Sequence, residues 1–233
     1  MSNQVPDGRA ELVDVAQSLD AAGLMPNKSG NVSIRTAGGF VITPAGTPYR
    51  ELASASLVEL SLENGELETG ATPHFSEKWG EKWGVAPVSR PSSEWRMHAA
   101  IYRAYPALGA IVHTHSPQAT ALACAGLGLP PFHYMIALAG GEVRCMPYAT
   151  FGSAELADYA VRGLEERRAT LLANHGVIAV GPTLRVAHAV ALEVENLAGQ
   201  WLVLRAAGLQ PQLLDAEELA RVIEKFAGYG RLD

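Results

Sequence analysis

The chain has 233 residues, 48% of them hydrophobic and 18% charged, and a formal net charge of -6 at pH 7. This composition is that of a folded protein and excludes a disordered chain, while the length suffices for one large domain with a single core. The negative charge argues against a nucleic-acid partner but leaves room for a local basic pocket that binds a phosphorylated metabolite.

Two further features bear on cellular location. Residues 1–10 contain no apolar signal-peptide core, and nowhere in the chain is an uninterrupted apolar run of membrane length. The two cysteines, Cys124 and Cys145, have apolar sequence neighbours, which indicates buried thiols in a reducing compartment rather than a disulfide. We therefore expect a cytoplasmic protein that has no membrane partner.

The first quarter of the chain is a helix followed by short strands. Apolar residues at helical spacing predict an amphipathic helix over residues 11–22. Gly30 and Asn31 then form a polar turn whose backbone N–H groups and side-chain amide could hold an anion, although a turn of this composition is more often only a turn. The predicted strands cover residues 32–36, 40–43 and 57–62.

Residues 66–90 contain a short tandem repeat and match neither the strand nor the helix pattern of the neighbouring segments. Two tandem Glu-Lys-Trp-Gly segments begin at Glu77 and Glu81, and each ends in glycine, a poor helix former. We predict a surface insertion within a single domain that spans residues 1–233. Its tryptophans would pack on a neighbouring element or on a partner subunit, and a substrate lid is the alternative left open.

Residues 91–94 read Pro-Ser-Ser-Glu and precede a predicted helix that Pro106 closes. Ser92 or Ser93 can cap this helix, which would place Glu94 in the first turn, where the helix dipole keeps a carboxylate ionised. This interpretation requires no catalytic role for Glu94. His98 lies inside the helix, and we interpret it as a packing residue.

The clearest chemical signal is a His-x-His pair at the polar end of an apolar run. If residues 111–115 are extended, His113 and His115 point to the same face, roughly 6.6 Å apart along the strand. A third histidine, His175, follows another strand-like apolar run. Three neutral imidazoles with an open fourth position are typical of a catalytic zinc site, although an isolated pair is more often two surface histidines.

Strands interleaved with helices fill the rest of the chain. The predicted helices cover residues 118–124, 153–167, 184–204 and 216–226, and the predicted strands 143–146, 169–173 and 177–180. This order predicts an α/β fold around one mostly antiparallel sheet flanked by helices. The glycine motifs of dinucleotide and P-loop sites are absent from the sequence, so those functions lack support.

Four motifs together resemble the class II aldolase/adducin family: Gly30-Asn31, Ser92-Ser93-Glu94, His113-Thr114-His115 and Asn174-His175-Gly176. The resemblance runs from the first helix to Tyr229, interrupted by the insertion, and is strongest to the branch of the family that cleaves L-fuculose 1-phosphate. It implies a zinc-dependent aldolase that cleaves a ketose 1-phosphate to dihydroxyacetone phosphate and an aldehyde through a zinc-stabilised enediolate.

The resemblance also implies roles for particular residues. It places Zn²⁺ on His113, His115 and His175, with Glu94 beside the metal as the acid/base. It implies a homotetramer with active sites at the subunit interfaces, into which aromatic residues reach largely from the neighbouring subunit: Tyr134 and Tyr229 as catalytic residues and Phe151 as a substrate contact. The implied phosphate pocket consists of Gly30, Asn31, Ala45, Gly46, Ser92 and Ser93, and to these we add Lys28 from its position beside the Gly30 turn.

Three departures from the family pattern leave the exact substrate open. Ala45 stands where a phosphate-binding threonine is usual, Lys28 adds a cation beside the Gly30 turn, and Asn174 stands where another histidine is usual. The same metal centre serves 4-epimerases, a methylthioribulose-phosphate dehydratase and sugar-acid phosphate decarboxylases, which remain alternatives. So does a non-catalytic adducin-like interaction module. A nitrogen-rich site would also accept another divalent transition metal.

Overall fold

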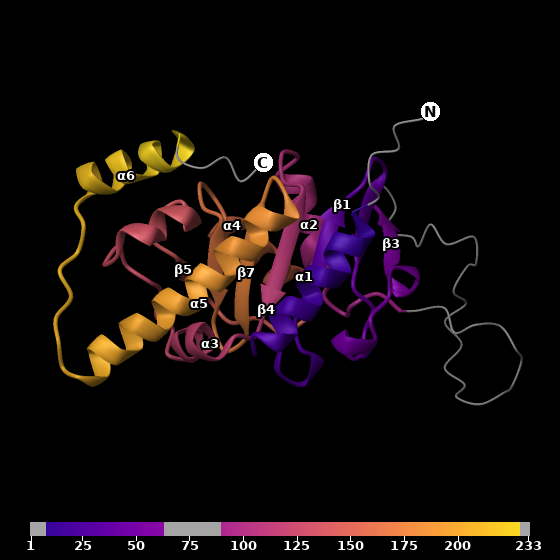
Figure 1. Cartoon of the computed structure of the whole chain (residues 1–233), viewed down its shortest axis with the longest axis horizontal. Coiled ribbons are helices and arrows are strands. Elements are labelled where there is room, and N and C mark those ends of the chain that lie inside the picture. Colours follow the sequence, from indigo (N-terminus) through magenta and orange to yellow (C-terminus); the bar gives the residue numbers. More distant parts are fainter. Residues whose placement is uncertain (1–7, 63–89, 229–233) are drawn as a thin grey trace, which may run out of the picture.

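The computed structural model describes residues 8–62 and 90–228, which form a seven-stranded sheet with helices on both faces (Figure 1). The strand order is β3-β2-β1-β4-β7-β6-β5. Neighbouring strands within the described residues are antiparallel except β5 and β6, which run parallel. The predicted α/β fold around one mostly antiparallel sheet is therefore confirmed.

The elements lie close to their predicted places. The strands are β1 (Asn31–Arg35), β2 (Gly39–Ile42), β3 (Val58–Ser61), β4 (Ala110–Thr114), β5 (Arg144–Met146), β6 (Ala169–Leu172) and β7 (Gly176–Gly181). The helices are α1 (Arg9–Ala21), α2 (Trp95–Ala104), α3 (Pro117–Cys124), α4 (Ala154–Gly163), α5 (Leu184–Ala206) and α6 (Ala216–Gly228). The single-turn segment η1 (Pro26–Lys28) and the longer η4 (Tyr134–Ala139) are 3₁₀ helices.

Two predictions about helix ends were wrong. The helix predicted to reach residue 167 ends at Gly163, because the chain turns there and Glu166 adopts a left-handed φ of 57°. The cap of α2 is Glu94 itself and not Ser92 or Ser93, and its side chain makes no capping hydrogen bond to the described residues. The Glu94 carboxylate is therefore available for other contacts.

Side-chain alternation along the strands divides the core into two layers. In β4, Val112 packs with Leu12 of α1 and Val190 of α5 in one layer, whereas Ile111 packs with Ile101 of α2 in the other. Figure 1 shows α1 and α5 crossing one face of the sheet. His113 shares the face of Ile111, so the polar end of β4 lies on the side that α2 covers.

The C-terminal helix α6 is set apart from the sheet and packs against η4 (Figure 1). Its apolar side chains Leu219, Val222 and Phe226 are only half-buried, and none of the side chains described in this helix is fully buried. An amphipathic helix in this state has an apolar face that the rest of its own chain covers incompletely.

The thiols differ from expectation in one respect. Cys124 is exposed at the end of α3 and Cys145 is half-buried, so the prediction of two buried thiols was wrong for Cys124 and held only in part for Cys145. Both are free cysteines.

Among the helices in the described ranges, none combines the length and apolarity needed to cross a bilayer. The predicted insertion lies, except for Arg90, outside the described residues, so the insertion and the single-domain division remain predictions.

Candidate metal centre and active site

His113 is held by the sheet on both sides. It lies in β4, opposite Asn31 of β1 and Ile178 of β7, and its side chain is fully buried. Its Nδ1 lies 2.9 Å from the Val177 carbonyl, an acceptor, so Nδ1 carries the proton. The lone pair of Nε2 therefore faces the neighbouring imidazoles, as it does in histidines whose second nitrogen is fixed by a backbone carbonyl.

The other two histidines lie just outside the strands. His115 follows the end of β4, and His175 lies in the turn between β6 and β7. Gly176 makes their approach possible, because a Cβ there would lie 2.4 Å from the Thr114 carbonyl and 3.0 Å from Cδ2 of His115. A side chain at position 176 would force the two histidine-bearing segments apart.

The three imidazoles meet edge to face. Their ring centroids are 4.9 to 5.0 Å apart, with interplanar angles of 70° to 90°. Nε2 of His113 lies 3.0 Å from Nε2 of His115. Ring nitrogens that converge in this way from three directions suit coordination of one metal ion rather than ring stacking.

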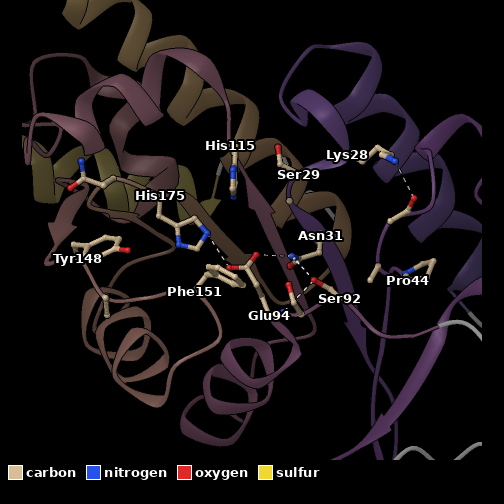
Figure 2. Close-up of a pocket in the computed structure, with 16 residues that line it drawn as sticks. Lys28, Ser29, Asn31, Pro44, Ser92, Glu94, His115, Tyr148, Phe151 and His175 are labelled. Atoms are coloured by element: carbon tan, nitrogen blue, oxygen red, sulfur yellow. Dashed lines mark hydrogen bonds and ion pairs between the residues drawn. The ribbon is translucent and has the colours of Figure 1, made fainter. Parts of the chain in front are cut away.

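Glu94 completes the cluster from the start of α2. It is 6% exposed, and its Oε2 lies 3.0 Å from Nε2 of His113 while its Oε1 lies 3.0 Å from Nε2 of His175 (Figure 2). Oε1 is buried and has no well-aligned hydrogen-bond donor among the described residues. The possible ligand atoms of the four residues all lie within 4.8 Å of one another.

Burial and the close contacts within this cluster shift the pKa values of its residues. Burial would raise the pKa of Glu94, but contact with the imidazoles of His113 and His175 lowers it well below the usual range, so the carboxylate is ionised. Burial would lower the pKa of His113, but Glu94 raises it. Burial and the neighbouring imidazoles of His113 and His175 lower the pKa of His115 to about 3, which leaves its ring neutral and its lone pair available.

These residues fit a divalent metal ion. Three imidazole nitrogens and a carboxylate oxygen are a ligand set that transition metals accept, and the buried Oε1 of Glu94 is an acceptor that a cation would satisfy. His113, His115 and His175 would hold the ion, with Glu94 at its side.

A pocket with a volume of about 360 Å³ opens onto this cluster. Figure 2 shows Lys28 and Pro44 at one end and Tyr148 at the other, with Glu94 and His175 between them. The lining residues are Lys28, Ser29, Gly30, Asn31, Pro44, Ala45, Gly46, Ser92, Ser93, Glu94, His115, Tyr148, Ala149, Phe151, Asn174 and His175. The pocket therefore joins the possible metal ligands to the polar turn around Gly30.

Asn31 links that turn to Glu94. Its Nδ2 donates to Oγ of Ser92 at 2.9 Å and to Oε2 of Glu94 at 3.1 Å (Figure 2). Its buried Oδ1 has no partner in the described part of the chain. Gly30 must be glycine, because its φ is +87° and a Cβ would lie 2.5 Å from the His113 carbonyl. The turn is thus pressed directly against the strand that carries His113.

Lys28 closes one end of the pocket. Asn27 and Lys28 adopt left-handed φ angles of 56° and 64°, a conformation that is uncommon for residues other than glycine. Nζ of Lys28 donates to the Gly46 carbonyl at 3.3 Å and so bridges the two loops of the rim. An ammonium group has three donors, so Lys28 can hold this bond and still contact an anion in the pocket.

The structure brings most of the predicted site residues together. The histidines and Glu94 cluster as described, and all seven predicted phosphate-pocket residues and Phe151 line the pocket. Tyr134 does not line it; this residue is 53% exposed, and its ring stacks on Phe226 of α6, with the centroids 6.2 Å apart. Tyr229 lies outside the described residues. The role of each residue remains a prediction.

Sequence reasoning did not select some lining residues. Tyr148 lies in the same loop as Phe151, and Asn174 precedes His175, so both could have been predicted from their position near a residue that was selected. Ser29 and Pro44 adjoin selected turn residues in the same way. Ala149 is buried, and its backbone position alone brings it to the pocket wall.

Comparisons with known proteins agree with this geometry. The family model described as the Class II Aldolase and Adducin N-terminal domain matches residues 10–202. A 5-methylthioribulose-1-phosphate/5-deoxyribulose-1-phosphate aldolase of Rhodospirillum rubrum is 43% identical over 224 residues, covering 95% of this chain and 92% of the relative. The L-fuculose phosphate aldolase of Escherichia coli K12 is 38% identical over 221 residues, covering 94% of each chain.

A solved structure of an L-fuculose 1-phosphate aldolase superposes with a TM-score of 0.83 at 35% sequence identity, covering 96% of this chain and 98% of the other. The match therefore includes the sheet, the helices and the turns that carry the histidines. The predicted family is confirmed, and this chain belongs to the class II aldolase and adducin family.

Proposed function

We propose that the protein is a zinc-dependent aldolase that cleaves a ketose 1-phosphate into dihydroxyacetone phosphate and an aldehyde. The observation that carries the proposal is the convergence of Glu94, His113, His115 and His175 at a pocket whose far end is a polar turn with a lysine. Relatives with named aldolase activity match nearly the whole chain.

The metal ion would stabilise charge on the substrate, and the side chains of the protein would bind the substrate and move its protons. When bound by the three histidines, the metal would act as a Lewis acid that stabilises negative charge on the substrate oxygens as the carbon–carbon bond breaks. Three neutral imidazoles add no charge, so the ion would keep a net positive charge even beside the Glu94 carboxylate, which suits an anionic transition state.

Glu94 would move the proton at the reacting carbon. In condensation, its carboxylate removes a proton from that carbon. In cleavage, the carboxylate would first be protonated by the proton that the aldehyde-forming hydroxyl releases, and would then return a proton to the carbon that loses the aldehyde. Asn31 would orient this carboxylate, because its Nδ2 donates to Oε2. Glu94 holds the cap position of α2, but its side chain makes no capping hydrogen bond to the described residues, which favours this catalytic interpretation.

The phosphate group would occupy the end of the pocket near the Gly30 turn. Oγ of Ser92 accepts hydrogen bonds from Nδ2 of Asn31 and from the backbone N–H of Glu94, so the Ser92 hydroxyl proton is free to be donated to another acceptor. Ser93, the Gly46 loop and the Lys28 ammonium would supply the remaining donors. Lys28 would compensate for the donor that Ala45 lacks, because an ammonium forms charge-assisted hydrogen bonds with phosphate.

A homotetramer with active sites at the subunit interfaces is also part of the proposal. Tyr134 is exposed and lies away from the pocket lining of its own chain, and α6 leaves its apolar face incompletely covered. Both observations suit a neighbouring copy that places Tyr134 and Tyr229 at this pocket, where Tyr134 would shuttle the proton of the hydroxyl that becomes the aldehyde, passing on its own phenol proton as it receives that one. Free cysteines agree with the cytoplasmic location that we propose.

The test uses purified protein and three candidate substrates: L-fuculose 1-phosphate, 5-deoxyribulose 1-phosphate and 5-methylthioribulose 1-phosphate. Release of dihydroxyacetone phosphate is measured before chelation, after chelation and after zinc is restored. The proposal predicts cleavage of at least one compound, loss of cleavage with chelator and recovery with zinc. Failure to cleave any of them in the zinc-loaded state would contradict it.

A further inference from the structure

The three histidines are not anchored equally. His113 lies within the sheet and has strand partners on both sides. His115 follows the end of β4, and His175 lies in the turn before β7. The positions of His115 and His175 must therefore depend on the segments next to them.

One helix connects those two segments. α3 begins at Pro117, two residues after His115. At its other end, the carbonyl of Ala123 accepts the backbone N–H of Asn174 at 3.2 Å, and Asn174 immediately precedes His175. α3 thus fixes the spacing between two of the three histidines.

The start of α3 is capped in an unusual way. Ser116 holds the cap position, but its hydroxyl makes no capping bond within the described chain and receives the Thr114 hydroxyl at 3.4 Å. Pro117 has no N–H group, so Gln118 and Ala119 supply the first donors that need an acceptor.

Glu195 of α5 provides that acceptor. Its Oε1 accepts a hydrogen bond from the backbone N–H of Gln118 and its Oε2 accepts one from the backbone N–H of Ala119, both at 2.9 Å, across 77 and 76 residues of sequence. A carboxylate at a helix N-terminus gains both from these bonds and from the helix dipole.

Glu195 lies on a helix that is anchored in the core. α5 is 23 residues long, and the neighbours of Glu195 on its inner face, including Val194, Leu197 and Ala198, are buried in the core. A Cβ on Gly199 would lie 3.5 Å from Cγ of Gln118, so α5 packs closely against the first turn of α3. A clamp on α5 can therefore hold α3 in one position.

We propose that Glu195 is a positioning residue for the metal centre. Its carboxylate clamps α3 to α5, which fixes His115 at one end of α3 and, through the Ala123–Asn174 hydrogen bond, His175 at the other. The inference rests on the proposed metal centre and adds to it a residue that touches neither substrate nor metal.

The test compares Glu195→Ala and Glu195→Gln with the matched control Glu193→Ala. Glu193 lies on the same helix, and within the described chain its Oε1 accepts a hydrogen bond from Nδ2 of Asn196 at 3.2 Å. Each protein is titrated with Co²⁺, and the visible absorption spectrum reports both the affinity and the ligand geometry. Supporting residues of metal ligands typically change metal affinity about 10–100-fold.

We expect Glu195→Ala to weaken Co²⁺ affinity about 10–100-fold and to alter the spectrum. Glu195→Gln, which keeps one acceptor oxygen, should fall between Glu195→Ala and wild type, and Glu193→Ala should match wild type. Adding Ser116→Asp to Glu195→Ala supplies a local cap for the same two amides and should recover affinity.

The outcomes are distinguishable. Wild-type affinity and spectrum in Glu195→Ala, even with a lowered melting temperature of the metal-free protein, would make Glu195 only a helix cap and overturn the inference. If Glu195→Ala does not fold, unchanged Co²⁺ affinity in Glu195→Gln overturns it equally. A wild-type protein that binds no Co²⁺ would instead refute the proposed metal centre.

Discussion

The contact between the Gly30 turn and His113 makes a sharp prediction for Gly30→Ala. Gly30 has a φ of +87°, and an added Cβ would lie 2.5 Å from the His113 carbonyl oxygen. That oxygen belongs to a residue of β4 paired with Asn31 and Ile178, so it cannot move without disturbing the sheet. The substitution therefore strains the backbone and the ligand strand together.

The magnitude follows from two costs. A left-handed conformation costs a residue other than glycine about 1–2 kcal/mol. Relief of a steric overlap in a packed region adds about 1–3 kcal/mol. Gly30→Ala should therefore lower the free energy of unfolding by about 2–5 kcal/mol. Gly46→Ala is the matched control, because Gly46 has a φ of +74° but no described atom lies within 4 Å of the added Cβ; it should cost only about 1–2 kcal/mol.

Urea unfolding of the metal-free proteins measures both values, and zinc content of the reconstituted proteins reports the effect on the ligand strand. Gly30→Ala should bind less zinc than wild type, whereas Gly46→Ala should bind a normal amount. Equal destabilisation by the two substitutions, or a smaller loss in Gly30→Ala, would refute the close contact between the turn and His113.

Three further predictions concern stability, substrate binding and assembly. Burial lowers the pKa of His98 to about 3, so its ring is neutral in the folded protein, whereas in the unfolded chain it takes up a proton below about pH 6.5. Urea titrations of the metal-free protein should therefore show about 1.4 kcal/mol less stability at pH 5.5 than at pH 7.5 from this residue. This loss should be absent from His98→Asn. Lys28→Gln should raise KM for the ketose phosphate about 10–100-fold with kcat nearly unchanged, and an unchanged KM would remove Lys28 from the phosphate site. Light scattering should report a mass about four times 24.7 kDa, and a fully active monomer would contradict the shared active site.

The predictable parts of the fold are those encoded over a few residues. Strand alternation placed His113 and His115 on one face, and helical periodicity located the main helices, because both patterns follow from backbone geometry. The start of α2 was harder to predict. Ser92 and Ser93 are good capping residues by type, yet Ser92 is bonded to Asn31 of a distant strand, so Glu94 became the cap.

Features that join distant segments had no local signal. His175 was grouped with the His-x-His pair because it too follows an apolar, strand-like run, but only the resemblance to a family brought Glu94 to the three histidines. The bonds from Glu195 to the start of α3 cross 76 and 77 residues and depend on how α5 packs. The exposure of Tyr134 likewise depends on tertiary packing, and in the proposed tetramer also on a second chain.

The proposed reaction depends on Glu94 moving a proton beside a metal ion held by three histidines. Zinc content and the rate of dihydroxyacetone phosphate release, both measured in wild type and Glu94→Gln, test this role. We expect about one zinc per chain in both proteins, because the three imidazoles remain. We expect a rate about 10²–10⁴-fold lower in the variant, because an amide cannot accept or return the proton. A near-normal rate in zinc-loaded Glu94→Gln would show that Glu94 is not the acid/base.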